Sequence, residues 1–116
     1  GSVPRDRDVE YVIMESVRED ETGLWEVIWS MNTQWPSATD VEKRHWAATA
    51  VEALLARGWV SLFKSRSSEA QQPKLGLSEA ELRGALLRKE TWMAPSDVPW
   101  GYYARITDKG HREFKW

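Results

Sequence analysis

The stretch TDVEKRHWAATAVEALLARGWVSLF, residues 39–63, carries the clearest structural signals in this chain of 116 residues. Thr39 and Glu42 have the spacing of a capping box, in which each side chain accepts a hydrogen bond from the other residue's backbone amide. Gly58 follows the helical pattern at the position where helices commonly end in a left-handed residue. Residues 59–63 then alternate between two sides in the manner of a strand. We therefore expect a long helix that leads directly into a strand.

The expected helix over residues 39–57 has two unlike faces. One face is apolar and is expected to pack in the core; it contains Val41, Ala47, Ala48, Val51, Leu54 and Leu55. The opposite face contains Glu42, Trp46, Thr49, Ala53 and Ala56, with His45 and Glu52 on one flank and Lys43 and Arg57 on the other. Arg44 falls near the middle of the apolar stripe, which predicts either a side chain that extends to solvent or a kink near residues 44–46.

Two further helices are expected before this segment. Apolar residues recur at helical spacing over residues 8–17. Thr22 is a good N-cap for a second helix, in which Trp25 and Trp29 lie four residues apart and are expected to face the core. That helix is expected to end at Trp35, because a residue that precedes proline avoids helical geometry.

The C-terminal half begins with loops around one more helix. The polar stretch at residues 65–73 and the proline-bounded stretch at residues 95–99 predict loops. Between them, Ser78 and Glu81 form a second capping box, which opens a helix that extends to about residue 90.

The order of these elements resembles that of winged-helix proteins. Residues 102–107 alternate like a half-buried strand and pass through Ile-Thr-Asp-Lys-Gly at 106–110 into a capped turn or short helix. In winged-helix proteins the last core helix ends in a glycine and enters the first strand of the wing, as Ala-Arg-Gly-Trp-Val does at 56–60. The second wing strand of that family ends in a threonine-x-x-glycine step into a C-terminal helix. The resemblance covers residues 22–64 and 101–114.

The resemblance implies an α+β domain, winged-helix-like, with a helical core and a two-stranded antiparallel wing. Residues 65–101, with their own helix, separate the two wing strands, where a short hairpin is usual, so we expect a helical insertion there. Residues 1–21 are expected to form an acidic N-terminal helix or extension, and residues 22–116 the winged-helix-like domain. Residues 39–57 contain no glycine-bearing turn, which departs from the standard DNA-reading geometry.

Composition and charge exclude several classes of protein. The length fits one domain, and the absence of cysteine excludes disulfides, thiolate nucleophiles and cysteine metal sites. No apolar run is long enough to span a bilayer, and the first residues lack a signal pattern, so we expect a cytoplasmic protein. The net charge of −2 excludes a globally basic nucleic-acid binder, although residues 1–42 carry −7 and residues 43–116 carry +5. Gly1-Ser2 is typical of a cloning remnant, which predicts either a segment of a longer protein or a native start at a valine-type codon.

Residues that could carry catalysis are few. The only histidines are His45 and His111. Glu42 and His45 match the Glu-x-x-His spacing of di-metal helical bundles, but such a site needs a second copy of the motif, which the sequence does not contain. The sequence also has no nucleophile elbow, glycine-rich phosphate loop or His-Glu-x-x-His motif. A serine–histidine–acid triad stays open because its members need not be adjacent in sequence, but we expect no catalytic activity, metal or cofactor.

The outer face of the helix over residues 39–57 suits contact with protein better than the reading of DNA. A groove-reading helix presents arginine, lysine, asparagine or glutamine to base edges, and carboxylates near phosphate weaken binding. Small residues let another backbone approach closely, and buried aromatic anchors supply most interface energy. The alternative is that the N-terminal helix covers this face within the monomer.

We therefore expect a non-catalytic module that binds another protein or a second copy of itself, with no membrane partner. The expected contact residues are Trp46, Thr49, Ala53, Trp92 and Trp100. Tryptophans beside prolines, at positions 35, 92 and 100, are expected to be exposed, Trp59 is expected in the core, and Trp116 is either docked or frayed. The alternative function is a DNA-binding winged-helix regulator that grips phosphate through the wing. The residues expected for that grip are Lys43, Lys64, Arg66, Lys74 and Arg105.

Overall fold

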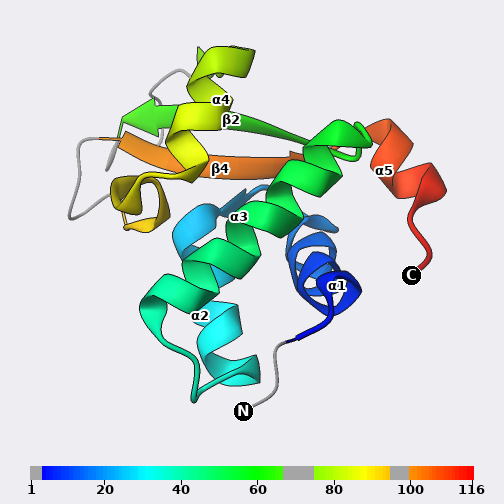
Figure 1. The fold of residues 1–116 in the computed structure, drawn as a ribbon. Helices are drawn as coiled ribbons and strands as arrows, with labels where there is room; N and C mark the ends of the chain where they lie inside the picture. Colours follow the sequence, from blue (N-terminus) through cyan, green and yellow to red (C-terminus); the bar gives the residue numbers. More distant parts are fainter. Residues whose placement is uncertain (1–3, 67–74, 95–99) are drawn as a thin grey trace.

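The computed structural model describes residues 4–66, 75–94 and 100–116, which form an α+β domain (Figure 1). In chain order its elements are α1 (Asp6–Val17), β1 (Thr22–Gly23), α2 (Leu24–Gln34), α3 (Asp40–Ala56), β2 (Val60–Arg66), β3 (Leu75–Gly76), α4 (Glu79–Leu86), the 3-10 helix η1 (Lys89–Trp92), β4 (Trp100–Ile106) and α5 (Asp108–Glu113). The α+β class expected from the sequence is confirmed.

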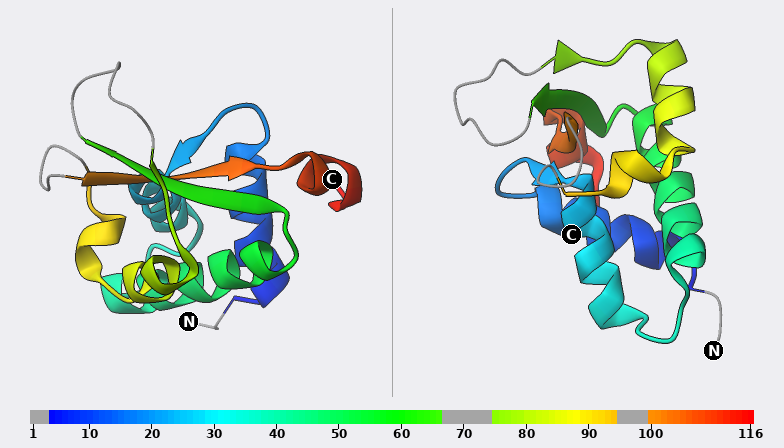
Figure 2. Two further views of the ribbon diagram at one scale, coloured as in Figure 1. Left: turned by 90° about the horizontal axis from the view of Figure 1, so that it is seen from above. Right: turned by 90° about the vertical axis from the view of Figure 1, so that its left-hand side faces the viewer.

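The strands form one antiparallel sheet in the order β1-β4-β2-β3. β2 and β4 pair along their whole length, from Val60 opposite Ile106 to Arg66 opposite Trp100. The expected antiparallel strand pair is confirmed, but the sheet is larger than the two strands expected, because β1 pairs with β4 and β3 pairs with β2, on edges that would otherwise be open. Helices α2, α3 and α4 lie on one side of the sheet (Figure 2).

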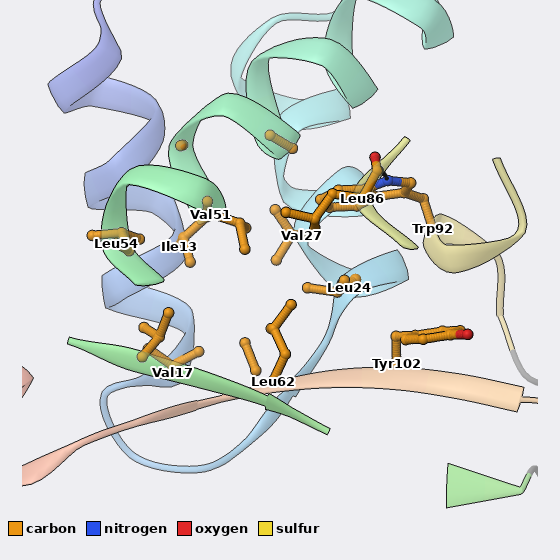
Figure 3. Close-up of a cluster of buried hydrophobic side chains, with 14 of the residues drawn as sticks. Ile13, Val17, Leu24, Val27, Val51, Leu54, Leu62, Leu86, Trp92 and Tyr102 are labelled. Carbon is orange, nitrogen blue, oxygen red and sulfur yellow. Dashed lines mark hydrogen bonds between the residues drawn. The ribbon is translucent and has the colours of Figure 1, made fainter. Parts of the chain in front are cut away.

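The core lies between the sheet and these helices. Figure 3 shows buried side chains from the helices and the sheet meeting in one cluster. The sheet residues that face the helices are Val60, Leu62, Tyr102 and Ala104. Ile13 and Val17 of α1 lie in the same cluster, and α1 packs beside α3. Helix α1 therefore contributes side chains to the same core as the other helices and the sheet.

Helix α3 matches the helix expected over residues 39–57. The amide of Glu42 donates to Thr39 Oγ1 at 3.1 Å, and the amide of Thr39 donates to Glu42 Oε1 at 2.9 Å. These hydrogen bonds hold the pKa of Glu42 below its ordinary value. Gly58 follows the helix with a φ of +74°, a conformation that favours glycine. The helix runs without a break from Asp40 to Ala56, so no turn interrupts it near residues 44–46.

The start of α2 differs from the expectation that Thr22 is its N-cap. Thr22 lies in β1, where it pairs with Ala104, and its hydroxyl donates to the Ser16 carbonyl oxygen at 2.7 Å. Gly23 is the N-cap instead, and its amide donates to Glu26 Oε2 at 2.9 Å. The sheet uses the residue that local preference assigns to the helix, because pairing with β4 satisfies its backbone groups while the Ser16 carbonyl oxygen satisfies its hydroxyl.

Helix α4 begins at its expected capping box and ends earlier than expected. The Ser78 hydroxyl accepts a hydrogen bond from the amide of Glu81 at 3.2 Å. The helix ends at Leu86, and the chain turns into η1, where Trp92 Nε1 donates to the Leu86 carbonyl oxygen at 3.2 Å (Figure 3). Burial of the Trp92 ring outweighs the helical preference of residues 87–90.

The segment expected as an insertion, residues 65–101, contributes to the sheet at both ends. β2 extends to Arg66, β4 begins at Trp100, and β3 lies between them in the chain. Residues 67–73 and 95–99, expected as loops, lie outside the described residues.

Helix α5 follows β4 through the threonine–glycine step. Thr107 Oγ1 accepts a hydrogen bond from the amide of Gly110 at 3.0 Å and donates to the Gly58 carbonyl oxygen at 2.6 Å. A Cβ atom at Gly110 would overlap the Trp59 carbonyl oxygen, so this close approach requires glycine. The short helix, one of the two alternatives expected here, is confirmed. Phe114 then packs its ring against Trp59, with 5.7 Å between the ring centroids.

Candidate functional site

The two sides of α3 differ in how completely they are covered. The buried residues of the inner side are Lys43, Ala47, Ala50, Val51 and Leu54. The exposed residues of the outer side include His45, Thr49, Glu52 and Ala56. Val41 was expected on the inner side and is 67% exposed, so that expectation is wrong. The buried stripe follows positions 43, 47, 50 and 54, and a residue at position 41 points almost the opposite way.

Helix α4 lies beside α3 (Figures 1 and 2). Side chains of α4 and of the outer side of α3 line a groove between them. The groove has a volume of about 540 Å³ and is lined by His45, Ala48, Thr49, Glu52, Leu55, Ala56, Leu82, Arg83, Leu86 and Leu87. A smaller hollow of about 210 Å³, which shares His45, Ala48, Leu86 and Leu87 with it, extends along α3 to Val41. We call the two hollows together the α3–α4 groove.

The α4 wall of this groove is fixed at both of its ends. Near the N-terminus of α4, the Glu81 carboxylate accepts a hydrogen bond from the Lys64 ammonium of β2 at 3.1 Å, which lowers the pKa of Glu81. Beyond its C-terminus, the Thr91 hydroxyl donates to the Ala85 carbonyl oxygen at 2.5 Å, and Trp92 is anchored in the core. Contacts of α4 with β2 and η1 therefore set the position of this wall, and the groove between α4 and α3 stays open.

The groove combines an apolar lining with a few polar groups. Leu87, the C-cap residue of α4, is 86% exposed at its rim. The Thr49 hydroxyl donates to the His45 carbonyl oxygen at 3.0 Å, so it is satisfied within α3. Glu52 and Arg83 lie on opposite walls, and neither forms an ion pair within residues 4–66, 75–94 and 100–116. Arg44, which lines the smaller hollow, also forms no ion pair within these residues. Among the described residues, the groove therefore has one carboxylate and two guanidiniums without an ion-pair or hydrogen-bond partner.

The tryptophans expected to make contacts are less exposed than the sequence predicts. Trp92 is only 5% exposed, so the expectation that it is exposed in a loop is wrong. Trp46 is half-buried, and its ring meets that of Trp35 edge-on with 6.4 Å between the centroids. Trp100 is half-buried, with the Lys64 ammonium 5.0 Å from its ring centroid. Aromatic packing within the chain occupies much of the surface that these residues could offer a partner.

The small residues expected on the contact face divide between two surroundings. Thr49 lies in the groove. Ala53 is half-buried, one turn before Arg57, whose guanidinium contacts the Glu10 carboxylate of α1. The alternative in which the N-terminal helix covers the small-residue face therefore holds for the Ala53 side of α3 and not for the groove side.

Most of the basic residues expected to grip phosphate are engaged within the chain. Lys43 is buried, and its ammonium donates to Asn32 Oδ1 of α2. The Lys43 ammonium is therefore not available at the surface. Lys64 and Arg105 each form an ion pair with a carboxylate at 3.1 Å. The side chain of Arg66 and the whole of Lys74 lie outside the described residues.

The remaining tryptophans correct one expectation and settle another. Trp29 was expected in the core and is 58% exposed, because α2 turns a different stripe inward. The buried residues of that stripe are Leu24, Val27 and Met31. Trp25 is half-buried, edge-on to Tyr103 with 5.3 Å between the ring centroids. Trp116 is docked, with its ring centroid 4.7 Å from that of Phe114.

The described residues show no cluster suited to a metal, since no three or more of their histidine and acidic side chains are grouped to hold one. His45 lies in the groove and His111 lies on α5. Burial raises the pKa of Tyr103, with a contribution from the Glu26 carboxylate, but that ring is stacked on Phe63 outside the groove. No helix in the described part of the chain has the length and apolarity needed to cross a membrane.

The leucines of α4 are the groove residues that sequence reasoning missed. Leu82 and Leu86 are four residues apart on one apolar stripe of α4, and each lines the groove. Leu87 falls outside that stripe. It lies about 100° further around the helix than Leu86 and is exposed. Adjacency to Leu86 gives no signal for this, since Ala85 and Leu86 are also adjacent and are both buried.

Comparisons with known proteins give no relative from which a function could be transferred. No protein-family model, curated protein or solved structure matches the chain. The functional assignment below therefore rests on the geometry and chemistry of the α3–α4 groove.

Proposed function

We propose that this protein is a non-catalytic binding module that holds a helical segment of a protein partner in the α3–α4 groove. The observation that carries this proposal is an open apolar groove, with Leu87 exposed at its rim. Its α4 wall is held in place by contacts with β2 and η1. Grooves of this kind bind amphipathic helices through their apolar face. Covering apolar surface contributes about 25 cal/mol per Å², so leucines left open beside a hollow favour an occupant.

A winged-helix-like arrangement is part of the same proposal. Helices α1 to α3 precede the antiparallel pair β2 and β4, and α5 follows through the step from Thr107 to Gly110. In this arrangement α2 and α3 correspond to the helix-turn-helix pair, in which the second helix enters the major groove of DNA. Helix α4 lies beside that second helix and adds Leu82 and Leu87 to its outer surface.

The chemistry of this surface favours a protein partner over DNA. The exposed carboxylates of Glu42 and Glu52 on α3 would lie near phosphates, where they weaken binding. Arg44 and Arg88 line the smaller hollow, and the Arg88 guanidinium donates to the Tyr102 hydroxyl at 3.3 Å. Leucine side chains offer base edges no hydrogen-bonding group, whereas they match the apolar face of a helix.

A displayed library of amphipathic helical peptides tests the proposal without a known partner. Peptides are selected on the immobilised wild-type chain and measured on two variants, Leu87→Glu in the groove and Trp29→Glu as a control. Trp29 is also exposed but lies on α2, outside the groove. We expect Leu87→Glu to weaken binding by at least about tenfold, because it places a charge against the apolar face, and Trp29→Glu to leave it unchanged.

A random-sequence DNA duplex provides the competing measurement. Phosphate-driven binding weakens steeply as salt concentration rises. Tight binding of the duplex with that salt dependence, or selected peptides that ignore Leu87→Glu, would contradict the proposed function.

A further inference from the structure

We infer that the segment held in the α3–α4 groove is an acidic amphipathic helix, whose apolar face covers the leucines and whose flanking carboxylates bind the arginines of the groove. This inference rests on the proposed function, which assigns the groove to a helix of a protein partner, and it adds the charge of that helix. The observation that carries it is the positive charge of the groove lining, in a chain whose net charge is −2.

The charges of the lining are unevenly placed along the groove. Arg83 and Glu52 lie on opposite walls of the larger hollow, so their charges balance. Arg44 of α3 and Arg88, the N-cap of η1, both line the smaller hollow, and no acidic side chain lines it within the described residues. With histidine neutral, the lining has a formal charge of +2, and this excess lies at the smaller hollow.

Carboxylates on the neighbouring elements do not offset this charge. The Glu42 carboxylate accepts a hydrogen bond in the capping box of α3, and the Glu81 carboxylate accepts one from the Lys64 ammonium of β2. Neither residue lines the groove, and Glu90 of η1 also lies outside both hollows. The positive charge of the groove is therefore left for an outside group to neutralise.

The three guanidiniums are in a state to bind such a group. Among residues 4–66, 75–94 and 100–116, none of Arg44, Arg83 and Arg88 has an ion-pair partner. Arg88 donates to the Tyr102 hydroxyl at 3.3 Å, which leaves the guanidinium charge unbalanced. Guanidiniums bind carboxylates through paired hydrogen bonds. Arginines beside exposed leucines therefore match a helix whose apolar face is flanked by glutamate or aspartate.

A displayed helical library measures the preferred charge directly. Its members share one apolar face, and every position that flanks this face is glutamate or lysine with equal frequency. We expect selection on the wild-type chain to enrich glutamate. We also expect the selected peptide to bind at least about tenfold more tightly than the same peptide with its flanking glutamates replaced by lysine, because attraction becomes like-charge repulsion. Enrichment of lysine, or of neither residue, overturns the inference.

Matched arginine variants locate the contact. Arg44→Gln removes a charge at the smaller hollow, and we expect it to weaken binding of the selected acidic peptide by about threefold, the effect of one partly screened ion pair. Arg83→Gln should have a smaller effect, because Glu52 lies across the groove from it. Arg112→Gln is the control, since Arg112 is exposed on α5 and outside the groove. Equal losses in all three variants, or none in any, overturn the inference.

The outcomes separate this inference from the proposed function. If the selected peptides show no charge preference but lose binding to Leu87→Glu, the groove holds a helix and only its acidic character is wrong. If no selected peptide depends on Leu87, both proposals fail. A random-sequence DNA duplex that loses more binding to Arg44→Gln than the acidic peptide does also overturns the inference, because phosphate would then be the ligand of this arginine. Circular dichroism checks that each variant keeps its fold.

Discussion

The inner and outer sides of α3 belong to one helix but are covered to different extents by the rest of the chain. On the inner side Leu54 is fully buried, and its neighbours are covered by α1, α2 and the sheet. On the outer side Thr49 and Glu52 stay exposed, although α4 lies close enough to form a groove. The inner side is filled by side chains of the same chain, whereas the outer side is left as a hollow.

Adjacent leucines of α4 show the same contrast within two residues. Leu86 is buried beneath α3 and contacts Trp92, whereas Leu87 is 86% exposed. One side of α4 packs in the core, whereas the other side is apolar and stays exposed. Leu87 continues the apolar lining of the groove to the surface, and contiguous apolar surface of this kind marks binding sites.

Replacement of Trp92 by alanine breaks the buried region most severely. The ring lies in the core and its Nε1 donates to the Leu86 carbonyl oxygen. We expect Trp92→Ala to lower the free energy of unfolding by about 3–5 kcal/mol, measured by urea denaturation. Trp29→Ala, at an exposed position, should stay within about 1 kcal/mol of the wild type. Equal losses in the two variants would remove the distinction between buried and open tryptophans.

Replacement of one buried leucine and one exposed leucine by alanine sharpens the comparison between the two regions. We expect Leu54→Ala to cost about 3 kcal/mol of unfolding free energy, because it leaves a cavity beneath α3. Leu87→Ala should change that free energy by less than about 0.5 kcal/mol, because its side chain is solvated in the monomer. A large loss at Leu87 in urea denaturation would mean that it packs within its own chain.

Removal of the N-cap of α3 tests the stability of the helix that carries both the inner and the outer side. Thr39 Oγ1 accepts a hydrogen bond from the amide of Glu42, and we expect Thr39→Ala to cost about 1 kcal/mol. Ser37→Ala is the matched control, because Ser37 is exposed and lies outside the capping box. Thermal denaturation should show a lower midpoint for Thr39→Ala alone. Similar midpoints for the two variants would show that the cap contributes nothing.

Acidification is expected to give the smallest effect, through the ion pair between Lys64 of β2 and Glu81 of α4. The hydrogen bond from Lys64 lowers the pKa of Glu81 in the folded state from an ordinary value of 4.5. A depressed folded-state pKa stabilises the fold above the unfolded value, and this stabilisation is lost as pH falls through the folded-state pKa. Between about pH 6 and pH 3, the wild type should therefore lose slightly more stability than Glu81→Gln. Identical pH profiles by thermal denaturation would contradict a role for this ion pair.

Local signals predicted the helices well because their causes are local. The capping boxes at Thr39 and Ser78 form as expected, since each depends on residues three positions apart. Thr22 was misassigned because its pairing partner, Ala104, is remote in the sequence. Trp29 and Val41 were placed on the wrong side because helical spacing gives a stripe but not the position of the neighbours that cover it.

The candidate site was predicted only in part. The outer side of α3 was singled out, and Thr49 lies in the groove as a contact residue should. Trp92 was expected to touch a partner but fills the core. The wall contributed by α4 was not foreseen, because its position depends on Trp92 and Lys64 holding it from outside the helix.

The sequence by itself determined the α+β class, the two capped helices and the strand pair that follows α3, because hydrogen bonds between near neighbours and the spacing of apolar residues specify them. Only the tertiary structure decided which side of each helix is covered and where α4 lies against α3. That outcome depends on contacts between residues far apart in the chain, whose meeting is fixed by how the whole core packs.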